Sequence, residues 1–114
     1  MSKSPSKKSS RSRDHHSVYV VYLRNPGGDG RAGYYVGMTG LSPQQRFQNH
    51  KNGIKCARVV KRCGERLVPR LYQHLNPMPF DKAKQMERTL ADRLRKHSKE
   101  KRETGRVDVI ISKL

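Results

Sequence analysis

Two short runs of β-branched and aromatic residues, separated by a glycine-rich segment, constrain the fold of this chain most strongly. Residues 18–23 and residues 34–37 have the composition that is typical of strands. Between them, residues 24–30 supply the Asn, Pro, Gly and Asp residues that favour turns. The pattern therefore predicts a β-hairpin with a long loop at its tip.

Two further segments carry the sequence signals of helices. Ser42 can cap a helix that starts at Pro43, and Gly53 can end it, so residues 43–52 are predicted to be helical. The longest predicted helix runs from Asp81 to about Lys96. Its apolar residues recur at helical spacing, at Ala83, Met86, Leu90, Ala91 and Leu94.

The remaining segments are predicted to be short elements or loops. Residues 56–62 could form a short helix and residues 66–72 a strand, which Pro69 would restrict to a sheet edge or a bulge. Residues 97–105 are charged and expected to be loose, and residues 107–111 could form a last short strand.

Charge indicates the class of partner. The chain of 114 residues has 26 Lys and Arg against 9 Asp and Glu, a formal net charge of +17. Such an excess favours a polyanionic partner, which could be DNA, RNA or an anionic membrane; the alternative is a basic surface without a binding role. Of the nucleic acids, DNA is expected rather than RNA. Residues 1–16 are predicted to be a disordered basic tail, residues 17–96 the folded domain, and residues 97–114 a charged extension.

Other classes are disfavoured. No apolar stretch reaches the roughly 18 residues of a membrane span, and no secretory signal is evident, so no membrane partner is expected. Cys56 and Cys63 are too few for a disulfide framework and are predicted to be free thiols in a reducing compartment. The expected location is intracellular, either cytoplasmic or nuclear.

Glu87 is the first candidate for chemistry. It lies four residues after Ala83 and four before Ala91, on or beside the apolar stripe of the predicted helix. A carboxylate in that position needs a cation, which could be a base such as Arg46 or a metal ion. One carboxylate, together with waters and substrate phosphate, is a common way to hold Mg²⁺.

Four other side chains could act beside Glu87. Arg46 and His50 are four residues apart on one helix face, where Arg can clamp a phosphate and His can move a proton. Tyr19 and Tyr35 fall on the paired strands, whereas Tyr22 and Tyr34 alternate with them and are expected to serve packing. The alternatives are surface charge for the helix pair and core packing for all four tyrosines.

These residues, taken in order, resemble the GIY-YIG nuclease family. The resemblance rests on Val18-Tyr19, Tyr35-Val36-Gly37 with Thr39, Arg46 and His50, and Glu87, and it covers about residues 17–96. It implies an α+β fold, with a small three-stranded antiparallel sheet flanked by helices. It also implies hydrolysis of phosphodiester bonds with a single Mg²⁺ or Mn²⁺ ion.

The resemblance also implies a role for each residue. Tyr19 would orient or deprotonate the attacking water, and Tyr35 would support that water and the phosphate. Arg46 would bind the phosphate, His50 would assist proton transfer, and Glu87 would hold the metal ion. Gly37 and Thr39 would help to position the substrate.

The chain departs from the family pattern at several positions. Ser17 stands where the first motif has Gly, Met38 where many members carry a base, and no Asn follows Glu87 at about a dozen residues. The alternative to a DNA endonuclease is therefore a weak or inactive DNA- or RNA-binding module with the same fold. A protein partner could supply specificity, since so small a domain has little room for sequence-reading elements.

Overall fold

The computed structural model describes residues 14–100 and 108–112. Within these ranges the chain forms an α+β fold, with one mixed four-stranded sheet and three α-helices. The strands are β1 (Ser17–Leu23), β2 (Gly33–Thr39), β3 (Gly64–Leu67) and β4 (Asp108–Ile111), in the spatial order β3-β1-β2-β4. Most of the predicted basic tail, at residues 1–13, lies outside the described residues.

The sheet has one more strand than the family resemblance implies. Strands β3, β1 and β2 pair in antiparallel fashion, but β4 pairs parallel with β2, with Val36 opposite Ile111. The prediction of a three-stranded antiparallel sheet was therefore incomplete. The apolar run at residues 107–111 predicted the strand correctly, but a short run carries no information about its partner or direction.

The predicted hairpin is confirmed. β1 and β2 pair along their whole length, with Tyr19 opposite Gly37 and Val21 opposite Tyr35. The loop between them places Asn25, Gly28 and Gly30 at positive φ, which explains its glycine-rich composition. Side chains alternate along the strands, so Tyr19 and Tyr35 share one face of the sheet.

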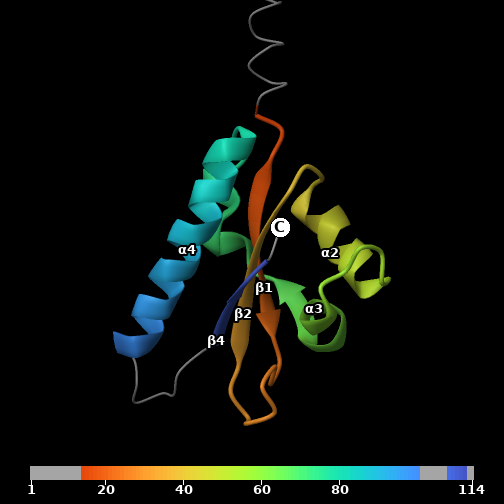
Figure 1. The fold of residues 1–114 in the computed structure, drawn as a ribbon, viewed down its shortest axis with the longest axis vertical. Helices are drawn as coiled ribbons and strands as arrows, with labels where there is room; N and C mark the ends of the chain where they lie inside the picture. Colours follow the sequence, from red (N-terminus) through yellow and green to blue (C-terminus); the bar gives the residue numbers. More distant parts are fainter. Residues whose placement is uncertain (1–13, 101–107, 113–114) are drawn as a thin grey trace, which may run out of the picture.

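Helices cover both faces of the sheet (Figure 1). α2 (Pro43–Lys51) and α3 (Arg58–Cys63) lie on one side, and α4 (Phe80–Glu100) packs on the other. The predicted start of α2 is confirmed, because the Ser42 hydroxyl accepts a hydrogen bond from the Gln45 N–H at 3.1 Å. Tyr22 and Tyr34 pack against each other with ring centroids 6.3 Å apart, as predicted.

Two predicted boundaries were wrong. The strand predicted at residues 66–72 ends at Leu67, and Pro69–Leu71 and Gln73–Leu75 form two 3₁₀ turns, η1 and η2. Proline has no N–H to donate, so a ladder cannot continue through Pro69. Residues 97–100 are helical rather than loose, because α4 continues to Glu100. Residues 101–107 lie outside the described ranges.

The side chain of Asn76 takes the place of a neighbouring strand at Val18, in the part of β1 that β3 does not reach. The amide of Asn76 accepts a hydrogen bond from the Val18 N–H at 2.9 Å and donates one to the Val18 carbonyl at 2.8 Å. Val18 is fully buried, so these bonds satisfy backbone groups that water does not reach. Among the helices of the described ranges, none has both the length and the apolar character needed to cross a membrane.

Candidate functional site

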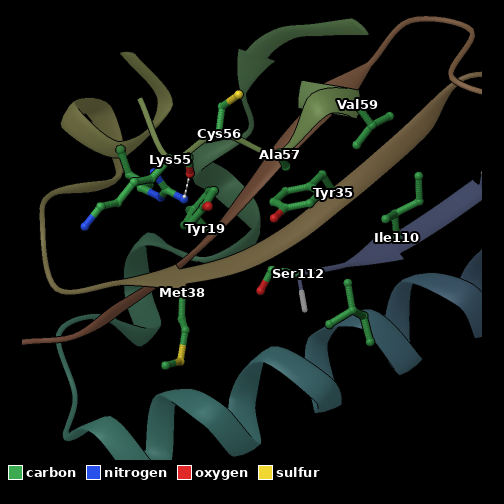
Figure 2. A pocket seen from close by; sticks show the side chains of 11 residues that line it. Tyr19, Tyr35, Met38, Lys55, Cys56, Ala57, Val59, Ile110 and Ser112 are labelled. Atoms are coloured by element: carbon green, nitrogen blue, oxygen red, sulfur yellow. Dashed lines mark hydrogen bonds between the residues drawn. The ribbon is translucent and has the colours of Figure 1, made fainter. Parts of the chain in front are cut away.

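A cavity of about 330 Å³ lies between the sheet and the helices α2 and α3 (Figure 2). It brings together three of the predicted site residues, Tyr19, Tyr35 and Arg46. The rest of its wall is formed by Met38, Lys55, Cys56, Ala57, Val59, Ile110, Ile111 and Ser112. Strand β4 and the residue after it thus supply one side of the cavity, which the sequence did not predict.

His50 is hydrogen-bonded through both ring nitrogens. Its Nδ1 accepts from the Ala57 N–H at 3.0 Å, and its Nε2 lies 2.9 Å from the Tyr19 hydroxyl. Because Nδ1 is an acceptor, the neutral ring carries its proton on Nε2 and donates it to Tyr19. The Tyr19 hydroxyl oxygen is then the acceptor, which leaves the phenolic proton of Tyr19 free for another partner.

His50 does not itself face the cavity. The side chain is fully buried and is absent from the cavity wall. Burial, together with the charge of Arg46, lowers the pKa of His50 to about 4. A neutral, doubly hydrogen-bonded imidazole can act on a substrate only through Tyr19, so it is a positioning residue in this arrangement.

The two phenols remain protonated at neutral pH. Burial raises the pKa of Tyr19 far above its usual value, and the neighbouring Tyr35 adds to the rise. Burial also raises the pKa of Tyr35, against hydrogen bonding with Ser112 and the charge of Arg46. Both phenols therefore act as hydrogen-bond donors, and the geometry favours orientation of a water over its deprotonation by Tyr19.

Arg46 reaches the cavity from α2 and is held by the loop that follows the helix. Its guanidinium donates to the Lys55 carbonyl at 2.8 Å and to the Ile54 carbonyl at 3.4 Å. Lys55 has a positive φ of 45°, so the loop turns its carbonyl toward the guanidinium. Arg46 lines the same cavity as Tyr19 and Tyr35, and its charge opposes the rise in the pKa of both phenols.

Glu87 lies on α4, on the other side of the sheet. Only 7% of it is exposed, in agreement with its predicted place on the apolar stripe. The Ser112 hydroxyl donates a hydrogen bond to its carboxylate. Among the described residues Glu87 has no salt-bridge partner within 4.0 Å, so the predicted alternative of an ion pair with Arg46 is not found there.

The buried surroundings of Glu87 favour its protonated form. Burial raises the pKa of Glu87, against hydrogen bonding with Ser112 and the charges of Lys84 and Arg88. A carboxylate that is buried with one neutral donor is under-compensated in its ionised form. It would therefore gain from a cation placed beside it.

The carboxylate and the phenols face two adjoining cavities. Glu87 lines a second cavity, of about 240 Å³, together with Phe80, Lys84 and Arg88. Three residues line both cavities: Met38, Ile111 and Ser112. Figure 2 shows Met38 pointing from β2 toward α4, away from Tyr35. The predicted residues thus form two groups, and the residues that the two cavities share, on β2 and at the end of β4, lie between them.

Gly37 and Thr39 occupy structural positions. A Cβ atom at Gly37 would lie 2.6 Å from the Tyr19 hydroxyl oxygen, so only glycine lets the phenol lie across the neighbouring strand. The Thr39 hydroxyl accepts from the Leu41 N–H at 3.0 Å and shapes the turn into α2. Both residues therefore support the arrangement of the site from β2.

Sequence reasoning did not identify Ser112. It follows β4, and its N–H donates to the Val36 carbonyl at 2.9 Å. Its hydroxyl bonds to Glu87 while the same residue lines the cavity of Tyr35. No signal in the sequence could have found it, because its position depends on the parallel pairing of β4 with β2.

Other observations complete the description of the site. Cys56 and Cys63 are free thiols, as predicted, and are half-buried. Within residues 14–100 and 108–112, no three His, Cys, Asp or Glu side chains gather in a group that could hold a metal ion.

No protein-family model, curated protein or solved structure matches this chain.

Proposed function

We propose that this protein is a metal-dependent endonuclease of the GIY-YIG type that hydrolyses phosphodiester bonds in DNA. The observation that carries the proposal is Glu87, a buried carboxylate without a salt-bridge partner among the described residues. It adjoins a cavity that holds two phenols and a guanidinium. The antiparallel order β3-β1-β2, with helices on both faces, supports the family resemblance, and β4 is an addition to that pattern.

The donor set fits a single hard cation. Mg²⁺ and Mn²⁺ prefer oxygen ligands, and Mg²⁺ is commonly held by one or two carboxylates with waters and substrate phosphate. Glu87 would provide the protein ligand, and the cation would compensate its buried charge. When bound, the ion supplies charge stabilisation at the phosphate oxygens.

The other residues have roles that follow from their bonds. Arg46 would clamp a phosphate oxygen with the donors that the loop carbonyls leave free. Tyr19 would orient the attacking water or the phosphate by a hydrogen bond from its phenolic O–H, because His50 already donates to its oxygen. Tyr35 would add a second donor, so that the substrate is held by groups that do not need to move.

A cleavage assay tests this proposal. Purified protein is incubated with single-stranded, duplex, branched and flap DNA, with Mg²⁺ or Mn²⁺ and with EDTA. Cleavage of at least one form is expected, and Glu87→Gln should reduce its rate by about 10²-fold or more. Glu65→Gln is the matched control, since Glu65 is an exposed carboxylate paired with Arg24. An absence of cleavage of every form, or a Glu87→Gln variant as active as Glu65→Gln, would reject the proposal.

The second candidate is a nucleic-acid-binding module without catalysis. The wall of Met38, Ile111 and Ser112 between Glu87 and the phenols favours it, together with the net charge of +17. This candidate requires binding that weakens steeply with salt, no cleavage, and an affinity that Glu87→Gln leaves unchanged or strengthens. The same panel of DNA forms, measured by fluorescence anisotropy, separates the two candidates.

A further inference from the structure

Three side chains on α4 form a line that leads past Glu87. Phe80, Lys84 and Arg88 follow one another at intervals of four residues, and all three line the Glu87 cavity. Residues at this spacing stand above one another on a helix face, over a length of about 12 Å. An aromatic ring and two cations thus border the cavity that contains the carboxylate.

Phe80 is exposed and yet held in position. Half of its surface is accessible, which makes it one of three large apolar residues with such exposure in the described part of the chain. Its ring forms a T-shaped pair with the imidazole of His16, with centroids 5.2 Å apart and planes at 73°. The Lys84 Nζ lies 5.8 Å from its centroid. A phenyl ring ordered by neighbours but open to solvent is the kind of platform on which unpaired bases stack.

The charges of Lys84 and Arg88 favour a polyanion on the side of α4 that carries Glu87. Lys84 and Arg88 are close enough to Glu87 for their charges to oppose the rise in its pKa. Two other acidic residues of this helix, Asp81 and Asp92, line a different cavity, which Phe80, Lys84 and Arg88 also border but Glu87 does not. A strand that follows the line on the Glu87 side therefore meets two cations and the carboxylate proposed to hold a metal ion.

We infer that Phe80, Lys84 and Arg88 bind a single-stranded segment of nucleic acid, with an unpaired base stacked on Phe80 and the adjoining phosphates against the two cations. The inference rests on the proposed function for its class of ligand and narrows the substrate to one with unpaired nucleotides beside the cleaved bond. Inside a duplex the bases are stacked on one another, so a blunt duplex offers the ring a base face only at its two ends.

Fluorescence anisotropy of the full chain tests the stacking. The probes are a labelled single-stranded DNA oligonucleotide and a blunt duplex of the same sequence, both without divalent metal. Phe80→Ala should weaken single-strand binding by about 5-fold or more and change duplex binding by less than about 2-fold. Phe80→Trp should retain single-strand affinity. Ile54→Ala is the matched control, because the Ile54 side chain is equally exposed and lines neither cavity beside Glu87 or Tyr19.

The cations are tested by the salt dependence of single-strand binding. Lys84→Ala should reduce the slope of log K against log salt by about 0.7, the value for one phosphate contact on a single strand. Lys82→Ala provides the control, because Lys82 is exposed on the same helix and lines neither cavity that contains Phe80. Equal slopes for the two variants would overturn the assignment of a phosphate contact to Lys84.

Several outcomes distinguish this inference from the proposed function. Equal weakening of single-strand and duplex binding by Phe80→Ala, or loss of affinity in a folded Phe80→Trp variant, would overturn the inference. If Glu87→Gln abolishes cleavage while Phe80→Ala binds single strands normally, the nuclease stands and the stacking platform does not. If no DNA is cleaved but Phe80→Ala weakens only single-strand binding, Phe80 binds unpaired bases in a protein that is not a nuclease. Circular dichroism melts establish that each variant is folded.

Discussion

His50 donates a hydrogen bond through Nε2 to the hydroxyl oxygen of Tyr19, 2.9 Å away, while its Nδ1 accepts from the Ala57 N–H. The bond links α2 to β1 inside the fold, where both side chains are at most 1% exposed. It fixes the direction in which Tyr19 can offer its own proton. The site therefore depends on a neutral imidazole.

The first prediction concerns pH. The pKa of His50 is about 4 in the fold and 6.5 in the unfolded chain. The unfolded chain binds more protons between these values, so this residue makes stability rise with pH from about 4 to 6.5. The effect is at most about 3 kcal/mol. Chemical denaturation of the protein and of His50→Gln, at about pH 5 and about pH 7, should show a smaller pH effect in the variant.

The titration of Glu87 changes stability with pH in the opposite direction, so its contribution must be separated from that of His50. Its pKa is raised above its usual value, so its contribution to stability is present at low pH and is lost as the carboxyl ionises. The difference between the protein and His50→Gln removes the Glu87 contribution, which both share. Parallel pH profiles for the two proteins would show that His50 is not held neutral.

The second prediction concerns Gly37. In Gly37→Ala the new methyl group would lie 2.6 Å from the Tyr19 hydroxyl oxygen and 2.7 Å from Cζ, closer than real Cβ atoms approach. Tyr19 must move, which should cost about 1–3 kcal/mol of stability and break its bond to His50. Urea denaturation measures the loss. Gly40→Ala should cost little, because its nearest neighbour would be His16 Nε2 at 3.5 Å, and an equal loss in both variants would contradict the packing argument.

The third prediction concerns the amide that completes the sheet. Asn76→Ala leaves both the N–H and the carbonyl of the buried Val18 without their partner. A buried backbone group without a hydrogen bond costs about 1–3 kcal/mol, so the free energy of unfolding should fall by about 2 kcal/mol or more. Asn52→Ala is a suitable comparison, since the Asn52 side chain is exposed and accepts only a long bond of 3.4 Å from Gln48. A loss no larger than that of Asn52→Ala would show that water replaces the amide.

Local signals predicted the elements of this fold well. The turn residues at 24–30 and the cap at Ser42 act over a few positions, so the hairpin and the start of α2 could be predicted from the sequence. Pairing over long distances could not be predicted in this way. The partner of β4 depends on how α4 returns the chain to the sheet, and neither the strand nor the helix specifies that by its own composition.

The candidate site shows the same limit. Helical spacing correctly placed Glu87 on a buried face, because that face is a local property of the helix. The spacing of Arg46 and His50 suggested that both side chains act together on a substrate. Instead Arg46 lines the cavity and His50 is buried behind Tyr19, because residues four apart share a helix face without sharing the same depth.

The last prediction concerns Ser112, whose hydroxyl donates to the Glu87 carboxylate at the wall between the two cavities. This hydrogen bond favours the ionised carboxylate and so lowers the pKa of Glu87 against the effect of burial. Ser112→Ala should therefore raise the pKa of Glu87, whereas Ser112→Thr, which keeps a hydroxyl, should leave it nearly unchanged. Titration of the Glu87 side-chain carboxyl by ¹³C NMR measures the shift directly. An unchanged pKa in Ser112→Ala would show that the hydroxyl does not stabilise the carboxylate.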